Sequence, residues 1–149
     1  MIKQRGFTLV ELLVVFAIGA LIVGIAPLAF QSLRESTEYR DTLRSLISDM
    51  RQARWRAMSE GRETLFSVDL RQRTYGIEGA PRHSLAQALT LRATVADQEL
   101  QANAVASIRF LPGGGASGGS FDLLRSSGSG VRVRVDWLTG RVEQEPLAQ

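Results

Sequence analysis

One ionisable side chain interrupts a long apolar stretch near the start of the 149-residue chain. Residues 7–30 (FTLVELLVVFAIGALIVGIAPLAF) contain Glu11 and no other charged residue. A carboxylate in a lipid-facing helix costs about 2–3 kcal/mol, so it needs a partner. Glu11 is therefore the first candidate functional residue, and the chemistry it offers is charge pairing in an apolar setting.

Other features that could indicate catalysis or ligand binding do not have the surroundings such chemistry needs. Residues 112–119 (PGGGASGG) share only their composition with a phosphate-binding loop, because no Lys-Ser/Thr pair opens a helix after them. We interpret them as a flexible connection between strands. His83 is the only histidine and follows Pro81 in a predicted surface loop, and residues 126–130 (SSGSG) indicate a turn. We predict no enzyme activity, no metal site and no cofactor.

The charge balance gives little reason to expect nucleic acid as a partner. The formal net charge is +3, and without Lys3 and Arg5 it would be +1. Arg51, Arg54 and Arg56 could form a face that binds nucleic acid or lipid, but acidic residues are interleaved with them, so we expect no stripe of one sign. The absence of cysteine excludes a disulfide scaffold and any Cys-based zinc site.

The apolar stretch predicts a membrane-crossing helix. Residues 7–30 are about long enough to span a hydrocarbon core of ~30 Å at ~1.5 Å per residue. The apolar part of a secretory signal peptide is shorter, about 7–15 residues, and no small-x-small cleavage site closes this one. An ordinary signal anchor, with Lys3 and Arg5 holding the N-terminus in the cytoplasm, is the alternative, but it gives Glu11 no role.

Residues 3–11 (KQRGFTLVE) resemble the type III leader of type IV pilins and type II secretion pseudopilins. In that family a membrane prepilin peptidase cuts after the glycine and N-methylates the next residue. The resemblance implies that residues 1–6 are a leader cut after Gly6, and that Phe7 becomes the methylated N-terminus. It also implies that Glu11 is the glutamate needed for assembly and that residues 7–30 form the transmembrane and assembly helix.

An amphipathic helix is predicted over residues 32–60. Residues 32–35 (SLRE) have the form of a capping box, so we expect the helix to restart at Ser32 after Pro27. Gly61 is a natural stop. A stripe of apolar residues at spacings of three and four predicts the face that packs on a sheet: Tyr39, Leu43, Leu46, Ile47, Met50, Ala53 and Ala57.

After Gly61 the hydrophobic period changes from helical to alternating, which predicts strands. The clearest alternation is 131–135 (VRVRV), with valines toward a core and arginines toward solvent. The predicted fold class is α+β, a long N-terminal helix packed on an antiparallel sheet over 63–143, within a domain over 31–149. The predicted strands are 63–70, 74–78, 89–96, 107–111, 121–124, 131–137 and 141–143.

Residues 110–115, 118–123, 131–136 and 139–142 resemble the C-terminal half of the minor pseudopilin H family of type II secretion. The shared pattern is a strand, a glycine-rich loop, a second strand and a hairpin containing Thr139-Gly140-Arg141. The resemblance implies a pilin-like subunit near the tip of a periplasmic pseudopilus that helps export folded proteins. It implies a single-pass inner-membrane protein with a cytoplasmic N-terminus and a periplasmic domain. The implied partners are prepilin peptidase, the major and other minor pseudopilins, the inner-membrane assembly platform and inner-membrane lipid.

Two related functions remain open at this point. A minor type IV pilin, acting in pilus initiation or DNA uptake, shares this domain, and some such pilins bind DNA near a turn like Gly140-Arg141. A major pseudopilin usually carries a calcium site in its C-terminal loop, but no acidic cluster is present there.

The leader generates the first testable prediction. The bond between Gly6 and Phe7 should be cut, because a residue without a side chain suits a narrow peptidase site. Mass spectrometry of protein extracted from membranes should find an N-terminus at methylated Phe7. Recovery of intact precursor alone, from a strain with active peptidase, would contradict the leader assignment.

Overall fold

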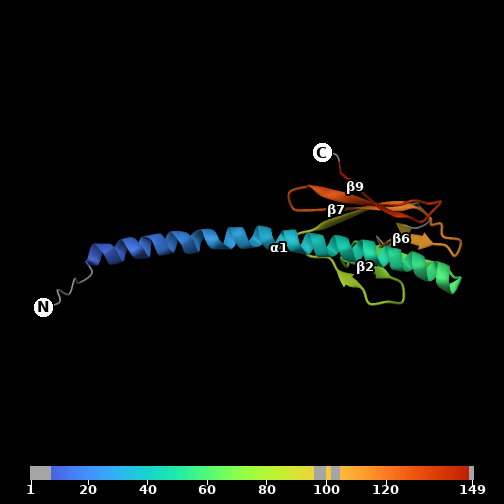
Figure 1. Ribbon diagram of the computed structural model, residues 1–149, viewed down its shortest axis with the longest axis horizontal. Helices are drawn as coiled ribbons and strands as arrows, with labels where there is room; N and C mark the ends of the chain where they lie inside the picture. Colours follow the sequence, from blue (N-terminus) through green and yellow to red (C-terminus); the bar gives the residue numbers. More distant parts are fainter. Residues whose placement is uncertain (1–7, 96–99, 102–104, 148–149) are drawn as a thin grey trace. The chain divides into compact units, whose positions relative to one another are not determined.

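The computed structural model describes residues 8–95, 100–101 and 105–147, and for residues 22–33 and 100–101 it describes the backbone alone (Figure 1). The chain divides into two compact units, Met1–Ser36 and Thr37–Gln149.

A single helix, α1, runs from Leu9 to Glu60. It includes Pro27 and Ser32, so the prediction of a restart at Ser32 was wrong. An interior proline costs about 3 kcal/mol, but a second helix would need a new and unfavourable nucleus, so continuation is favoured. The end of the helix is as predicted, because Gly61 follows Glu60 with a φ of 66°, the left-handed conformation that closes helices.

In the first unit, the apolar side chains at the start of α1 are uncovered. Every residue from Leu9 to Leu21 is exposed, and the large apolar ones are between 51% and 78% exposed. Among the residues that the structure describes, no helix combines the length and the apolarity needed to cross a membrane.

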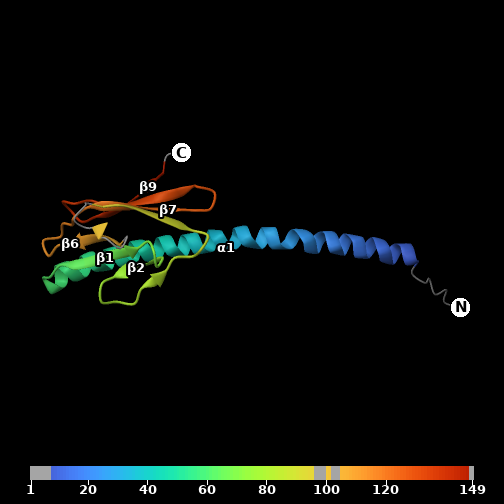
Figure 2. The same ribbon diagram turned by 180° about the vertical axis from the view of Figure 1, so that it is seen from behind.

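In the second unit, α1 packs with two antiparallel sheets. In Figures 1 and 2, one layer carries the labels β1, β2 and β6, and the other carries β7 and β9. One has the order β3-β2-β1-β6-β5 and the other β4-β7-β8-β9. The α+β prediction is confirmed, although the expected single sheet is two. The strands are β1 Thr64–Asp69, β2 Thr74–Ile77, β3 His83–Ser84, β4 Thr90–Thr94, β5 Leu100–Gln101, β6 Val105–Phe110, β7 Gly119–Leu124, β8 Gly130–Val135 and β9 Val142–Pro146.

The first hairpin forms where the sequence predicts it. Asp69 Oδ1 accepts hydrogen bonds from the amides of Arg71 at 2.9 Å and Gln72 at 2.8 Å, which fixes the turn between β1 and β2. Arg73, the last residue of this turn, has a left-handed φ of 55°. The two-residue strands β3 and β5 were not predicted, because two residues carry no readable alternation.

The core joins the helix to both sheets. Met50 and Ala53 on the predicted stripe are fully buried, and Leu43 is the one stripe residue that is only partly buried. Phe66 on β1 and Phe121 on β7 are both 0% exposed, and their rings meet edge to face with centroids 5.8 Å apart. This aromatic contact connects the two sheets.

A fragment that begins near Ser32 should fold alone, and its circular dichroism spectrum should show the mixed helix and strand content of the second unit.

In this fragment, Phe121→Ala should lower the free energy of unfolding by roughly 3–5 kcal/mol, because it empties the centre of the core. The measurement is the urea midpoint followed by circular dichroism. Leu138→Ala is the control, since this side chain is 67% exposed, and it should change stability by less than about 0.5 kcal/mol. Equal effects of the two substitutions would contradict this core.

Candidate assembly site at the start of α1

Glu11 lies in the first turn of α1 and is hydrogen-bonded to Thr8, the residue directly before the helix. Glu11 Oε2 accepts hydrogen bonds from Thr8 N at 2.9 Å and from Thr8 Oγ1 at 2.8 Å. In return, Glu11 N donates to Thr8 Oγ1 at 3.3 Å. This reciprocal pair is a capping box, with Thr8 as the N-cap and Glu11 three residues later.

The capping box changes the interpretation of Glu11. The sequence predicted a carboxylate in need of a partner, and the structure supplies hydrogen bonds from within the same turn. The signal was present, because Thr8-Leu9-Val10-Glu11 has the T-x-x-E spacing. The bonds supply no opposite charge, since residues 8–30 contain no Lys, Arg or His. Gly6 and Phe7 lie outside the described residues, so cleavage and methylation stay predictions.

The glycine-rich segment is held by an arginine of α1. Arg54 Nε donates to the carbonyl oxygens of Gly114 at 3.3 Å and Thr139 at 3.1 Å. Gly140 has a φ of 63°, and a Cβ there would lie 2.4 Å from Gly114 O. The segment is therefore packed against the β8–β9 turn, and its carbonyls are used within the chain. The sequence did not indicate Arg54, because a helical arginine gives no sign of which loops it will meet.

His83 lies on β3 and has partners that the sequence did not indicate. Its Nε2 is 3.4 Å from Asp49 Oδ2 on α1, and its ring stacks on Tyr75 with centroids 5.4 Å apart. Burial raises the pKa of the Asp49 carboxyl, and the nearby His83 and Arg56 partly oppose that rise. Among the described residues, no three His, Cys, Asp or Glu side chains gather to hold a metal ion.

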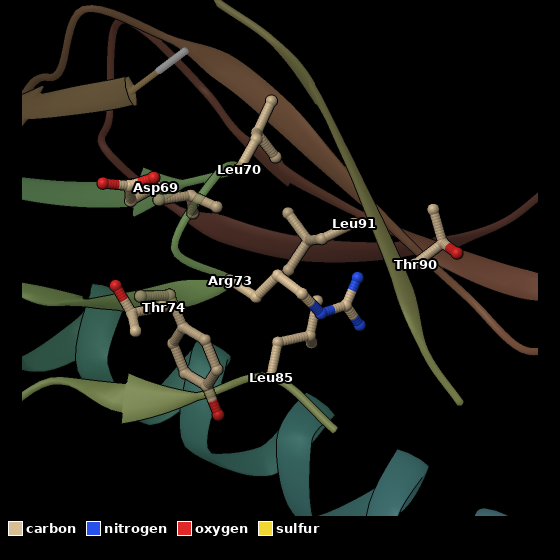
Figure 3. A pocket seen from close by; sticks show the side chains of 9 residues that line it. Asp69, Leu70, Arg73, Thr74, Leu85, Thr90 and Leu91 are labelled. Carbon is tan, nitrogen blue, oxygen red and sulfur yellow. The ribbon is translucent and has the colours of Figure 1, made fainter. Parts of the chain in front are cut away.

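A cavity of about 180 Å³ lies beside the β1–β2 turn, between Tyr75, Leu85 and Leu91 (Figure 3). The side chain of Arg73 lines it. Its Nη2 donates to Ala86 O at 2.8 Å and Leu89 O at 2.7 Å. Arg73 thus holds the segment between β3 and β4 in place beside the cavity.

The comparisons with known proteins agree with this arrangement. Residues 42–140 match the family model of the type II transport protein GspH, and residues 1–27 match the prokaryotic N-terminal methylation motif. The chain belongs to the GspH family. It is 31% identical over 145 residues to the type II secretion system protein H of Xanthomonas campestris pv. campestris, covering 97% of this chain and 85% of that protein.

Solved structures show the same fold. The minor pseudopilin EpsH of the type 2 secretion system of Vibrio cholerae matches with a TM-score of 0.58 at 12% identity, covering 75% of this chain and 99% of that one. The type IV minor pilin FimU of Pseudomonas aeruginosa matches with a TM-score of 0.57 at 18% identity, covering 76% and 92%. The fold is thus shared by both systems, whereas the GspH family model and the Xanthomonas relative favour type II secretion.

Membership in the GspH family confirms the predicted resemblance. The chain is a type II secretion minor pseudopilin, a structural subunit that associates with other pseudopilins. The N-methylation motif further indicates a membrane-anchored periplasmic protein.

The capping box generates a prediction about Thr8. Thr8→Ala should fray the first turn of α1, because an N-cap hydroxyl is worth about 0.5–2 kcal/mol. Amide exchange of the full chain in micelles, read at Val10 to Leu12, should quicken about 2- to 30-fold. Thr8→Ser keeps the hydroxyl and should exchange like the parent chain. An unchanged rate in Thr8→Ala would show that the capping box does not hold the helix start.

Proposed function

We propose that this GspH-family chain is a subunit near the tip of the periplasmic pseudopilus, where it helps export folded proteins across the outer membrane. The observation that carries the proposal is the exposed apolar start of α1, which lies within the residues that match the N-methylation motif. Large apolar surface of this extent is unfavourable in water, so it must be covered by lipid or by other helices.

Before assembly, lipid covers the apolar start of α1. Residues 7–30 cross the inner membrane once, with the N-terminus in the cytoplasm and the domain in the periplasm. Lys3 and Arg5 support this orientation, because cationic residues stay on the cytoplasmic side. Prepilin peptidase then cuts between Gly6 and Phe7 and methylates the new amine.

During assembly, neighbouring helices replace the lipid. Glu11 then pairs with the methylated N-terminal amine of an adjacent subunit, either the major pseudopilin or another minor one. Attraction between opposite charges is strong where the dielectric constant is low, so this pairing favours entry into the filament and fixes its axial register. Thr8 satisfies the carboxylate until that amine arrives. The inner-membrane assembly platform is the place of this exchange.

The proposed role is structural, and we propose no enzymatic activity, cofactor or metal for it. Nucleic acid is not proposed as a partner. The formal charge after removal of the leader would be +1, which offers few phosphate contacts.

Two substitutions of Glu11 test the charge pairing. Glu11→Gln keeps an oxygen that can accept from Thr8, so it preserves the cap and removes only the charge. Glu11→Ala removes both. Membrane insertion and cleavage after Gly6 should be normal in both variants, whereas crosslinking to other pseudopilins and export of the secreted protein should be impaired in both.

The comparison between the two variants separates the roles of Glu11. If charge pairing drives assembly, Glu11→Gln is nearly as defective as Glu11→Ala in crosslinking. If the cap alone matters, Glu11→Gln assembles normally and the charge-pairing mechanism fails. Normal crosslinking of both variants would remove Glu11 from assembly altogether.

A further inference from the structure

Four large apolar side chains are exposed in the described part of the second unit, and they define what we name the tryptophan patch: Trp55, Met58, Trp137 and Leu138. Trp55 is 66% exposed, Trp137 and Leu138 are 67% exposed, and Met58 is 48% exposed. Both tryptophans of the chain belong to this patch. Tryptophan and methionine are enriched at protein interfaces and tryptophan at their most energetic positions, so their joint exposure indicates a binding surface.

The four side chains come from two segments that the fold brings together. Trp55 and Met58 are three residues apart on α1, and so lie on one face of it. Met58 Sδ lies 3.7 Å from where a Cβ of Gly114 would be. The carbonyl of Trp137 in turn accepts a hydrogen bond from Ala116 N at 2.9 Å. The glycine-rich segment therefore joins the helix end to the Trp137–Leu138 turn.

Glycine at the contact positions allows this close packing. A Cβ on Gly115 would lie 3.0 Å from Trp137 O, and one on Gly118 would lie 3.1 Å from Trp137 Cβ. A larger residue at either position would push the turn away. On its other side, Trp137 borders an open hollow of about 620 Å³ that Gly118, Gly119 and Val95 also line. The patch thus combines aromatic anchors with an adjoining depression, as interface centres do.

The rim of the patch is basic. Arg51 lies one turn before Trp55, Arg141 directly follows the turn, and both are exposed. Arg54 lies between the helix and the turn. The rim also carries the carboxylate of Asp136, whose Oδ1 accepts hydrogen bonds from Thr139 N and Thr139 Oγ1, both at 2.8 Å. These bonds hold the pKa of Asp136 below its usual range. Three arginines, Arg51, Arg54 and Arg141, against the one carboxylate of Asp136 give the rim a net positive charge.

We propose that the tryptophan patch docks a different pilin-like subunit, one that presents apolar side chains flanked by carboxylates. This inference rests on the proposed function, because it assigns the surface through which the periplasmic domain meets its neighbour. Charge selects the occupant. A second copy of the same patch would bring arginine against arginine, which is repulsive, whereas an acidic surface is attracted.

The position of the patch along α1 distinguishes it from a lipid-binding surface. About 27 Å of helix, at about 1.5 Å per residue, separates Trp55 from Thr37, where the second unit begins. The segment that the proposed function places in lipid precedes Thr37. The patch therefore lies at the opposite end of this unit's part of the helix, where another protein domain can reach it.

The experiment uses the full chain in cells that make the whole secretion system, with every other leader-bearing subunit carrying its own tag. A photocrosslinking amino acid replaces Leu138 in one strain and Val14, in the exposed start of α1, in another. Position 138 should give an adduct with a tagged subunit other than this chain, and the crosslinked peptide should contain Asp or Glu.

Charge reversal with a matched control tests the rim. Arg51→Glu with Arg141→Glu should lower the position-138 adduct at least about fivefold, and so should Trp55→Ala with Trp137→Ala. Arg71→Glu with Arg92→Glu makes the same change of net charge at exposed positions on the β1–β2 turn and β4, and should leave the adduct unchanged. An equal loss in this control would overturn the proposal.

The Val14 strain separates this proposal from the proposed function. Adducts at position 14 without a subunit adduct at 138 would overturn the docking surface and leave the pseudopilus assignment standing. Adducts at 138 only with lipid, or only with a second copy of this chain, would also overturn it. The absence of subunit adducts at both positions would reject the proposed function and the docking surface together.

Discussion

One continuous helix must satisfy two different solvents, and the rest of the structure depends on that constraint. From Leu9 to Leu21, α1 is apolar apart from Glu11 and uncovered, whereas its later part buries only one stripe. A helix is the only element that can serve both surroundings, because all its backbone hydrogen bonds are internal. The apolar part needs lipid or other helices, and the amphipathic part needs sheets. The protein is therefore a folded domain attached to an assembly element.

The domain is built to cover the stripe and to fix the end of the helix. Two sheets supply the apolar cover, and the contact between Phe66 and Phe121 holds them together. At the end of α1, Arg54 binds the carbonyls of Gly114 and Thr139, and the glycine-rich segment between them contacts Met58 on one side and Trp137 on the other. This half-buried arrangement of glycine and arginine thus also carries the segments that bear the proposed docking surface.

Glu11 shows how a residue can be satisfied in the free subunit and still, in the proposed function, favour assembly. Its hydrogen bonds to Thr8 remove the cost of an unpartnered carboxylate, but they leave its charge uncompensated. A neighbouring amine adds the missing charge interaction, which gains strength where water is excluded. In the proposed assembly, the bound subunit is favoured by the difference between a neutral hydrogen-bond donor, Thr8, and a cationic one.

The sequence by itself determined the elements whose signal is local. The stripe from Tyr39 to Ala57, the stop at Gly61, the turn after Asp69 and the alternation over 131–135 each follow from side-chain type and spacing, and the leader motif is contiguous. The tertiary structure alone decided that the strands form two sheets, that Arg54 holds two loops, that His83 meets Asp49, and that both tryptophans stay exposed. These contacts join residues far apart in the chain, and the energy that selects them lies in packing and hydrogen bonds formed only after the helix and sheets are in place. A period of two or of 3.6 specifies which face of an element is buried, but not what covers it.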